Sequence, residues 1–256
     1  MAVNFANNPW LAAGLMAISA GVVGLLEVRG LSSALALAPI SVGFILAQPP
    51  STQTPIPPAL LVGLIALVAG LYATLLSMPI QKRIKRPKLK PVTRSRAATY
   101  AVVLAAMVAV AAWFVVTFHL GHGGGWLILT IIVLVQPFVQ DSFKKTIQRV
   151  AGTTIGFVFA TIVAEITKTP SVIYVVGIIA MEIAILAMLT GRPYWQYVTC
   201  LTTAIVLLEG ANTSVLDTAV TRLVATITGA AAVLAVTAIA QPLAKRSALS
   251  RGQARY

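Results

Sequence analysis

The chain has 256 residues, of which 58% are hydrophobic and only 10% are charged. Its mean hydropathy of +0.91 lies far outside the range of soluble domains, so the composition indicates an integral membrane protein. Six acidic residues stand against nineteen lysines and arginines, which gives a formal net charge of +13. The basic stretches lack the interleaved aromatic residues that stack on bases, so no nucleic-acid partner is expected.

Apolar stretches recur along the chain at the length that a membrane crossing requires. A helix needs about 20 residues to cross roughly 30 Å of hydrocarbon. The stretches at 125–139 and 194–209 are short, so we expect them to extend at their ends or to be partly broken within the bundle. The predicted fold is an all-α polytopic helix bundle of nine spans, at residues 10–27, 31–48, 58–80, 97–120, 125–139, 149–166, 171–190, 194–209 and 219–242.

Charge and proline divide the chain into four predicted parts. The run from Lys82 to Arg96 holds eight basic residues together with Pro87 and Pro91, so we expect a non-helical linker near anionic lipid headgroups. The four parts are a three-span module at 1–80, this cytoplasmic linker at 81–96, a six-span domain at 97–243 and a basic cytoplasmic tail at 244–256.

The basic residues also predict how the spans are oriented. If nine spans alternate across the membrane, seventeen of the nineteen lysines and arginines fall on one side, leaving Lys168 and Arg222 near the other. Basic loops stay in the cytoplasm, so we expect the amino terminus outside and the carboxyl terminus inside. The opening MAVNFANNP lacks a positively charged segment, which favours a retained first span over a cleaved signal peptide.

Two segments share an unusual pattern. QRVAGTTIG, at 148–156, and TRLVATITG, at 221–229, each place threonine four residues and glycine seven residues after an arginine, and no other arginine has both. At about 100° per residue these offsets fall on one stripe of a helix. Each helix therefore presents a cation, a hydroxyl group and a glycine without a side chain on one face. The residues are Arg149, Thr153 and Gly156 in the first segment, and Arg222, Thr226 and Gly229 in the second.

The likeness between the two segments extends upstream. WLILT begins at Trp126 and WQYVT at Trp195, and each has a threonine four residues later, Thr130 and Thr199. Each unit then holds three spans. Because an odd number of crossings reverses the following unit, the pattern predicts a three-plus-three inverted-topology repeat in 97–243. Many secondary transporters use such a repeat to alternate between two open states around a site near the membrane midplane.

The repeated arginines are the first candidates for substrate binding. We expect each to open its helix, where the positive end of the helix dipole favours an anion. Two alternatives stay open: the arginines can reach lipid phosphates while Thr and Gly only allow close helix packing, and the nearby aromatic residues can belong to an interfacial belt. The predicted substrate-binding residues are Arg149, Thr153, Arg222, Thr226, Trp126, Tyr194 and Trp195.

Glu182 is the only acid well inside a predicted span. An ionisable residue within a membrane is a functional hypothesis by default, so we predict that Glu182 couples transport to protons. The alternative is a buried partner that locks Arg192 or Arg149 between helices. Asp141 and Glu209 lie at span ends, where solvated loop carboxylates are the more common case.

The sequence predicts neither a metal site nor a catalytic set. His119 and His122 have no nearby acid to complete a metal site; ordinary loop histidines are favoured, and a pH-responsive loop stays an alternative. Cys200 stands alone. The run Gly123–Gly125 predicts a tight, flexible turn before a short helix. No nucleophile, base and acid occur in one pattern, so we expect neither an enzyme nor a cofactor.

Three segments together resemble the membrane domain of the fusaric acid resistance and aromatic acid exporter family, the FUSC-like proteins. The likeness covers about residues 97–243, and its motif combines tryptophan, threonine, arginine, Gly-Thr and glycine with an RPYW segment. The segments are GGWLILTIIVLVQPFVQDSFKKTIQRVAGTTIGFVFA, GRPYWQYVTCLTTAIVLL and TRLVATITGAAAVLA.

The resemblance implies export of aromatic carboxylic acids or related organic anions across a bacterial inner membrane, with plant organic-anion channels as fold relatives. Typical bacterial members resemble two membrane halves, whereas this chain shows one copy, so we expect a homodimer. The expected function is proton-coupled export by alternating access, with a small organic anion and membrane lipids as partners. An organic-anion channel of the same fold and a non-transporting scaffold for envelope assembly stay open as alternatives.

Overall fold

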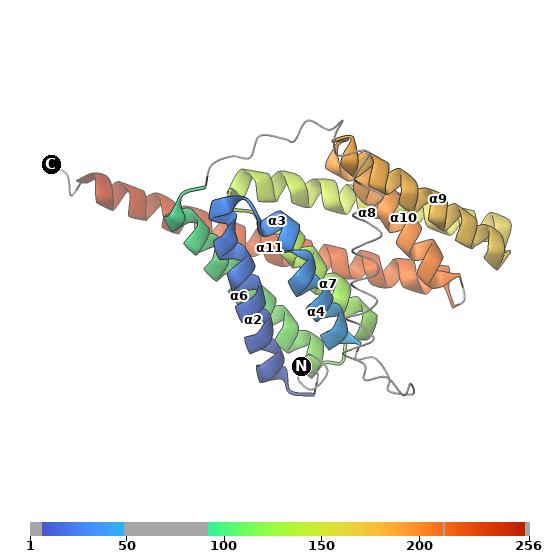
Figure 1. Cartoon of the computed structure of the whole chain (residues 1–256), viewed down its shortest axis with the longest axis horizontal. Coiled ribbons are helices and arrows are strands. Elements are labelled where there is room, and N and C mark those ends of the chain that lie inside the picture. The colour runs from blue at the N-terminus through green and yellow to red at the C-terminus, as the bar shows by residue number, and fades with distance from the viewer. Residues whose placement is uncertain (1–6, 49–91, 212, 254–256) are drawn as a thin grey trace.

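The structure is a computed structural model that describes residues 7–48, 92–211 and 213–253. Within these ranges the chain forms helices joined by short connections and no strands, as Figure 1 shows. This confirms the all-α prediction. The predicted span at 58–80 and most of the basic linker lie outside the described residues.

The first helix, α2 (Pro9–Leu25), begins at a well-formed cap. The side chain of Asn8 accepts hydrogen bonds from the backbone N–H groups of Trp10, at 3.0 Å, and Leu11, at 3.3 Å. These bonds satisfy donors that the start of a helix leaves unpaired. With the short helix η1 (Leu26–Arg29) that follows, α2 is long and apolar enough to cross a membrane, as the first predicted span requires.

The second predicted span, 31–48, is broken into two short helices, α3 (Ser32–Leu35) and α4 (Leu37–Ala47). Pro39 explains the break. Proline has no N–H to donate to the carbonyl of Leu35, and its ring crowds that carbonyl. The eleven residues of α4 are too few to cross a bilayer, so this span is not confirmed.

The next pair of helices corrects two expectations about loops. Helix α6 (Arg94–Thr117) begins at Arg94, so the last residues of the predicted non-helical linker are helical. Helix α7 (Gly121–Leu134) contains the run Gly123–Gly125, which we expected to form a flexible turn. These glycines instead allow α7 to approach its neighbours closely. A Cβ on Gly124 would lie 2.4 Å from the side chain of Val115 on α6.

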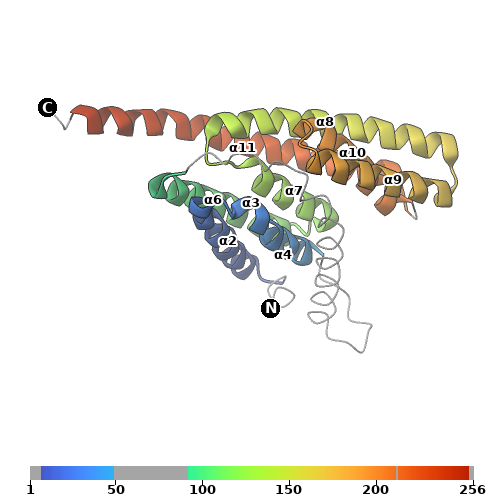
Figure 2. The same cartoon turned by 45° about the horizontal axis from the view of Figure 1, so that its top comes forward.

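The carboxyl-terminal half contains the two longest helices. They are α8 (Val139–Thr167), with 29 residues, and α11 (Val215–Gln253), with 39. Between them along the chain come α9 (Pro170–Leu189) and α10 (Tyr194–Gly210). Figure 2 shows α8 and α11 side by side and running in opposite directions.

Five helices of the described chain are long and apolar enough to cross a membrane, and the predicted nine spans are not confirmed. Helices α7 and α10, with 14 and 17 residues, are short, as the sequence indicated. Large apolar side chains are exposed on the longer helices, as a surface against lipid requires. The five are Pro9–Arg29, Arg94–Thr117, Val139–Thr167, Pro170–Leu189 and Val215–Ile239.

Buried apolar side chains form two clusters that share α11. One joins α2, α4, α6 and α7 to α11, and the other joins α8, α9 and α10 to α11. In Figure 2 the first group lies to the left and α9 and α10 lie to the right. Helix α11 therefore links the two halves of the described structure.

The helices that carry the repeated motif pack across the two predicted three-span units. Helix α8 packs mainly on α10, and α11 packs about equally on α7 and α8. A Cβ on Gly156 of α8 would lie 2.7 Å from the backbone oxygen of Thr199, and one on Gly229 of α11 would lie 2.9 Å from Cγ2 of Thr130. The glycine of each motif thus contacts the threonine that follows the tryptophan of the other unit. The inverted orientation of the repeat stays a prediction.

We expect Gly156→Ala to lower the free energy of unfolding by about 1–3 kcal/mol, because α8 and α10 must separate to admit the methyl group. The thermal unfolding midpoint of the purified protein in detergent measures this. Gly14→Ala is the matched control, since Gly14 is also helical and a Cβ there meets nothing within 4 Å. Equal losses in the two variants would contradict a close contact at Gly156.

Candidate functional site

The repeated arginines lie deeper in their helices than the sequence suggested. Helix α8 begins at Val139 and α11 at Val215, so Arg149 and Arg222 are about three turns and two turns from the helix start. The dipole at a helix end acts only within the first turn. The predicted placement of both arginines at helix N-termini is therefore wrong. Polar residues before Arg149 continue the helix, which a search for apolar stretches could not reveal.

Arg149 is buried between α8 and α10. Its side chain is 3% exposed, and Nη1 donates a hydrogen bond of 3.2 Å to the hydroxyl oxygen of Tyr194. Lys145, one turn earlier on α8, places Nζ 5.4 Å from the centre of the same tyrosine ring. Tyr194 therefore contacts two cations. Nε of Arg149 is buried and has no hydrogen-bond partner among the described residues.

Arg222 is buried between α11 and α7 at 2% exposure. Its guanidinium carbon lies 3.9 Å from the centre of the Trp126 ring, close enough for a cation–π interaction. Trp126 is itself 6% exposed and meets the ring of Phe44 edge to face, with 4.8 Å between ring centres. Within the described chain, Nε and Nη1 of Arg222 are buried without a hydrogen-bond partner.

The two arginines lie on neighbouring helices, and we treat them as one candidate site. Helices α8 and α11 pack on each other, and the charges of Arg149 and Arg222 are close enough to repel. Thr153 and Thr226, one turn further along each helix, are each 1% exposed. The hydroxyl of Thr153 is buried without a partner in the described ranges. We call this group the arginine site, and it consists of Arg149, Thr153, Arg222, Thr226, Trp126 and Tyr194.

The arginine site has the chemistry of an anion receptor. Buried hydrogen-bond donors without acceptors are costly, and neighbouring buried cations also need an opposite charge nearby. A carboxylate accepts hydrogen bonds from two guanidinium donors at once. An anion between the two arginines would therefore satisfy the unpaired donors and offset the repulsion.

Two predicted site residues lie outside the arginine site. The side chain of Trp195 is 38% exposed and lines a surface groove of about 550 Å³ along α9 and α10. Glu182 is exposed on α9. Among the described side chains, neither Arg149 nor Arg192 forms an ion pair with it. The substrate contact of Trp195 and the proton-coupling role of Glu182 stay predictions.

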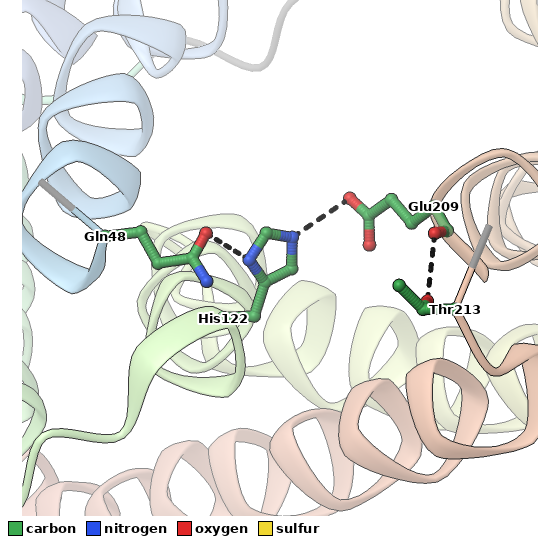
Figure 3. Close-up of polar contacts among 4 residues, drawn as sticks. All are labelled: Gln48, His122, Glu209 and Thr213. Atoms are coloured by element: carbon green, nitrogen blue, oxygen red, sulfur yellow. Dashed lines mark hydrogen bonds and ion pairs between the residues drawn. The ribbon is translucent and has the colours of Figure 1, made fainter. Parts of the chain in front are cut away.

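The sequence analysis missed a polar cluster that Figure 3 shows. His122, expected in a loop, lies in the first turn of α7, and its Nε2 is 3.5 Å from Oε1 of Glu209 on α10. Its Nδ1 contacts the side-chain oxygen of Gln48, just after α4. Glu209, expected as a solvated loop carboxylate, attracts Arg222 electrostatically. Only the scarcity of acids in the sequence could have drawn attention to it.

A comparison with known protein families identifies the family of the chain. The model of a family described as fusaric acid resistance protein-like matches residues 108–236, just over half of the chain. The chain belongs to the fusaric acid resistance protein-like family. The matched residues contain both arginine motifs and both tryptophan helices, so the resemblance seen in the sequence is confirmed.

Membership of the fusaric acid resistance protein-like family, together with the apolar helices, makes this chain a multi-pass membrane protein of a transporter family. The match includes α7 to α10, the last ten residues of α6 and the part of α11 that carries Arg222, but it excludes α2 and α4. No curated protein and no solved structure matches the chain.

Arg222→Met tests whether the arginine site is built for a ligand or for packing. In buffer that lacks organic anions, we expect this variant to unfold at the wild-type temperature or above, because an unpaired buried charge is removed and most of the volume is kept. Benzoate at a hundredfold excess over its Kd should stabilise the wild type by about 3 kcal/mol but leave Arg222→Met unchanged.

Thermal unfolding in detergent provides both measurements. Arg29→Met is the control, since Arg29 is exposed at the end of η1 and should leave the benzoate effect intact. A large loss of stability in Arg222→Met without benzoate would show that Arg222 serves the packing of the fold and not a ligand.

Proposed function

We propose that the chain is a proton-coupled exporter of aromatic carboxylic acids, or of similar amphipathic organic anions, that works by alternating access in the bacterial inner membrane. One observation carries the proposal. Two buried arginines, Arg149 and Arg222, have hydrogen-bond donors that no described residue accepts from. Family membership supports transport, and the arginine site supports the class of substrate.

The charge of the arginine site favours an anionic substrate. Arg149 and Arg222 repel each other in a setting where water is excluded, and such charges interact more strongly than they would in water. A carboxylate between them relieves the repulsion and accepts from the free Nε and Nη1 of Arg222. A neutral or cationic substrate would leave these groups unsatisfied.

The aromatic side chains of the arginine site favour an anion that carries an aromatic or otherwise apolar group. Trp126 lies against the guanidinium of Arg222, and the hydroxyl of Tyr194 bonds to Arg149. Each arginine therefore has an aromatic neighbour from a short helix. A flat apolar ring attached to a carboxylate can stack on such side chains while its charge stays between the arginines.

The pairing of helices from the two predicted three-span units supports alternating access. Arg149 and Tyr194 belong to the pair α8 and α10, whereas Arg222 and Trp126 belong to the pair α7 and α11. We assign the moving bodies to these two pairs. Rocking of one pair against the other changes the separation of the two arginines and opens the arginine site to one side at a time.

The distribution of basic residues supports an outward direction of transport. With nine alternating spans, seventeen of nineteen basic residues fall on the proposed cytoplasmic side, with the carboxyl terminus there and the amino terminus outside. Lys145 lies on that side of Arg149 and shares its tyrosine neighbour. A cytoplasmic anion thus meets a cation before it reaches the buried arginines.

The outer face of α9 supports a homodimer. Ile179, Glu182, Ile183 and Leu186 share one stripe of that helix and are all exposed. A carboxylate that faces lipid in the middle of a span is costly. A second copy of the chain over this stripe would shield Glu182 from hydrocarbon and place the two carboxylates at the interface.

Flux through proteoliposomes tests the arginine site. With an imposed pH gradient, we expect Arg149→Ala and Arg222→Ala each to lower the uptake of labelled benzoate by about 100-fold or more, as loss of a buried charge contact does. Arg29→Ala, which removes an exposed arginine, should transport at the wild-type rate.

The alternatives predict different results in the same experiment. Unchanged flux in both buried-arginine variants would overturn the assignment of the arginine site. A benzoate conductance that needs both arginines but no pH gradient would identify an anion channel. Absence of wild-type flux over a panel of organic anions would favour the scaffold.

The proton-coupling role of Glu182 has its own test. We expect Glu182→Gln to keep benzoate binding but to remove the dependence of uptake on the pH gradient, because the amide cannot exchange a proton. Glu165→Gln, which neutralises an exposed acid on α8, is the control and should keep that dependence. A wild-type pH profile in Glu182→Gln would place the coupling elsewhere.

A further inference from the structure

His122 joins three helices that are distant in the sequence. It lies on α7, and its two ring nitrogens contact Glu209 of α10 and Gln48 beside α4. Both contacts are to side-chain oxygens, so the imidazole with a proton on each nitrogen satisfies them fully. When it carries both protons, His122 is thus placed to hold the Glu209 carboxylate by charge.

The Glu209 carboxylate is only half satisfied in this arrangement. Oε1 faces His122, whereas Oε2 is buried and has no hydrogen-bond partner among the described residues. The side chain is 32% exposed, so part of the group is already removed from water. A buried carboxylate oxygen without a donor is costly, and an additional donor nearby would be favourable.

Arg222 supplies the complementary unpaired groups. Its Nε and Nη1 are buried without acceptors in the described structure, and its charge is attracted to Glu209. Arg149 repels Arg222 at the same time. Arg222 therefore lacks an acceptor, and the nearby Glu209 lacks a donor.

We propose that Glu209 is an internal counter-anion that competes with the transported anion for Arg222, and that His122 restrains it. In the empty arginine site, the Glu209 carboxylate is drawn towards Arg222. A substrate carboxylate at Arg222 cancels this attraction, and Glu209 then stays with His122. This inference rests on the proposed function, because it needs an anion that binds at Arg222.

The contact to Gln48 gives the amino-terminal module a part in this competition. Residue 48 lies outside the family match at 108–236, whereas His122, Glu209 and Arg222 lie inside it. Gln48 orients the His122 ring through the nitrogen that does not face Glu209. Through Gln48, the amino-terminal module therefore affects how strongly His122 holds the Glu209 carboxylate.

Benzoate binding to the full-length chain in detergent, measured by isothermal titration calorimetry at one pH, tests the proposal. We expect Glu209→Gln to tighten binding by about tenfold, within the usual range for coupling between sites, because the competitor loses its charge. His122→Gln should weaken binding several-fold, since glutamine can hydrogen-bond but cannot carry the charge that restrains Glu209. The double variant should match Glu209→Gln alone, because the restraint has no effect without the competitor.

Asp217→Asn is the matched control. Asp217 is an exposed acid on the same helix as Arg222, and its neutralisation should leave benzoate binding unchanged. A thermal unfolding curve for each variant confirms that it is folded. The shift in His122→Gln has the opposite sign to that in Glu209→Gln, so a general loss of structure cannot imitate the pattern.

The outcomes separate this inference from the proposed function. If Arg222→Ala abolishes benzoate binding but neither Glu209→Gln nor His122→Gln shifts it, the competition is overturned and the anion site stands. If Arg222→Ala binds benzoate like the wild type, or the wild type does not bind it, both proposals are overturned. Additive shifts in the double variant would show that His122 acts independently of Glu209.

Discussion

The burial of two like charges is the constraint on which the rest of the structure depends. Arg149 and Arg222 are almost completely inaccessible and repel each other, which a fold tolerates only where an opposite charge can enter. Each guanidinium is supported from one side by an aromatic residue of a short helix, Tyr194 or Trp126. The remaining donors face no described acceptor, and this is the observation on which the proposed anion site rests.

Glycines make this arrangement possible by allowing helices to approach closely. Gly156 meets the backbone of α10, and Gly229 meets Thr130 of α7, so the same helical stripe that carries each arginine also carries its packing surface. Without a hydrophobic force between helices in lipid, such close contact is a main source of association. The packing interpretation of the repeated motif is therefore confirmed, and the predicted substrate-binding role concerns the same face of each helix.

The sequence was sufficient for the all-helical fold and the family, because apolar composition and the repeated motif report directly on these. It was insufficient for element boundaries. Hydropathy could not show that polar residues extend α8 to Val139, or that Pro39 breaks the second predicted span. It was also insufficient for His122 and Glu209, since their contact depends on helix packing between distant segments. Glu182 stood out by its isolation, but the acid that attracts Arg222 electrostatically is Glu209.

The shortness of α7 and α10 has an electrical consequence. At about 1.5 Å per residue, their 14 and 17 residues span about 21 and 26 Å, less than the roughly 30 Å of hydrocarbon in a bilayer. The barrier around the arginine site is thus thinner than the membrane, and the membrane potential falls across a shorter distance. Each elementary charge that crosses this field contributes about 2.3 kcal/mol per 100 mV. With the cell interior negative, that energy favours the outward movement of an anion.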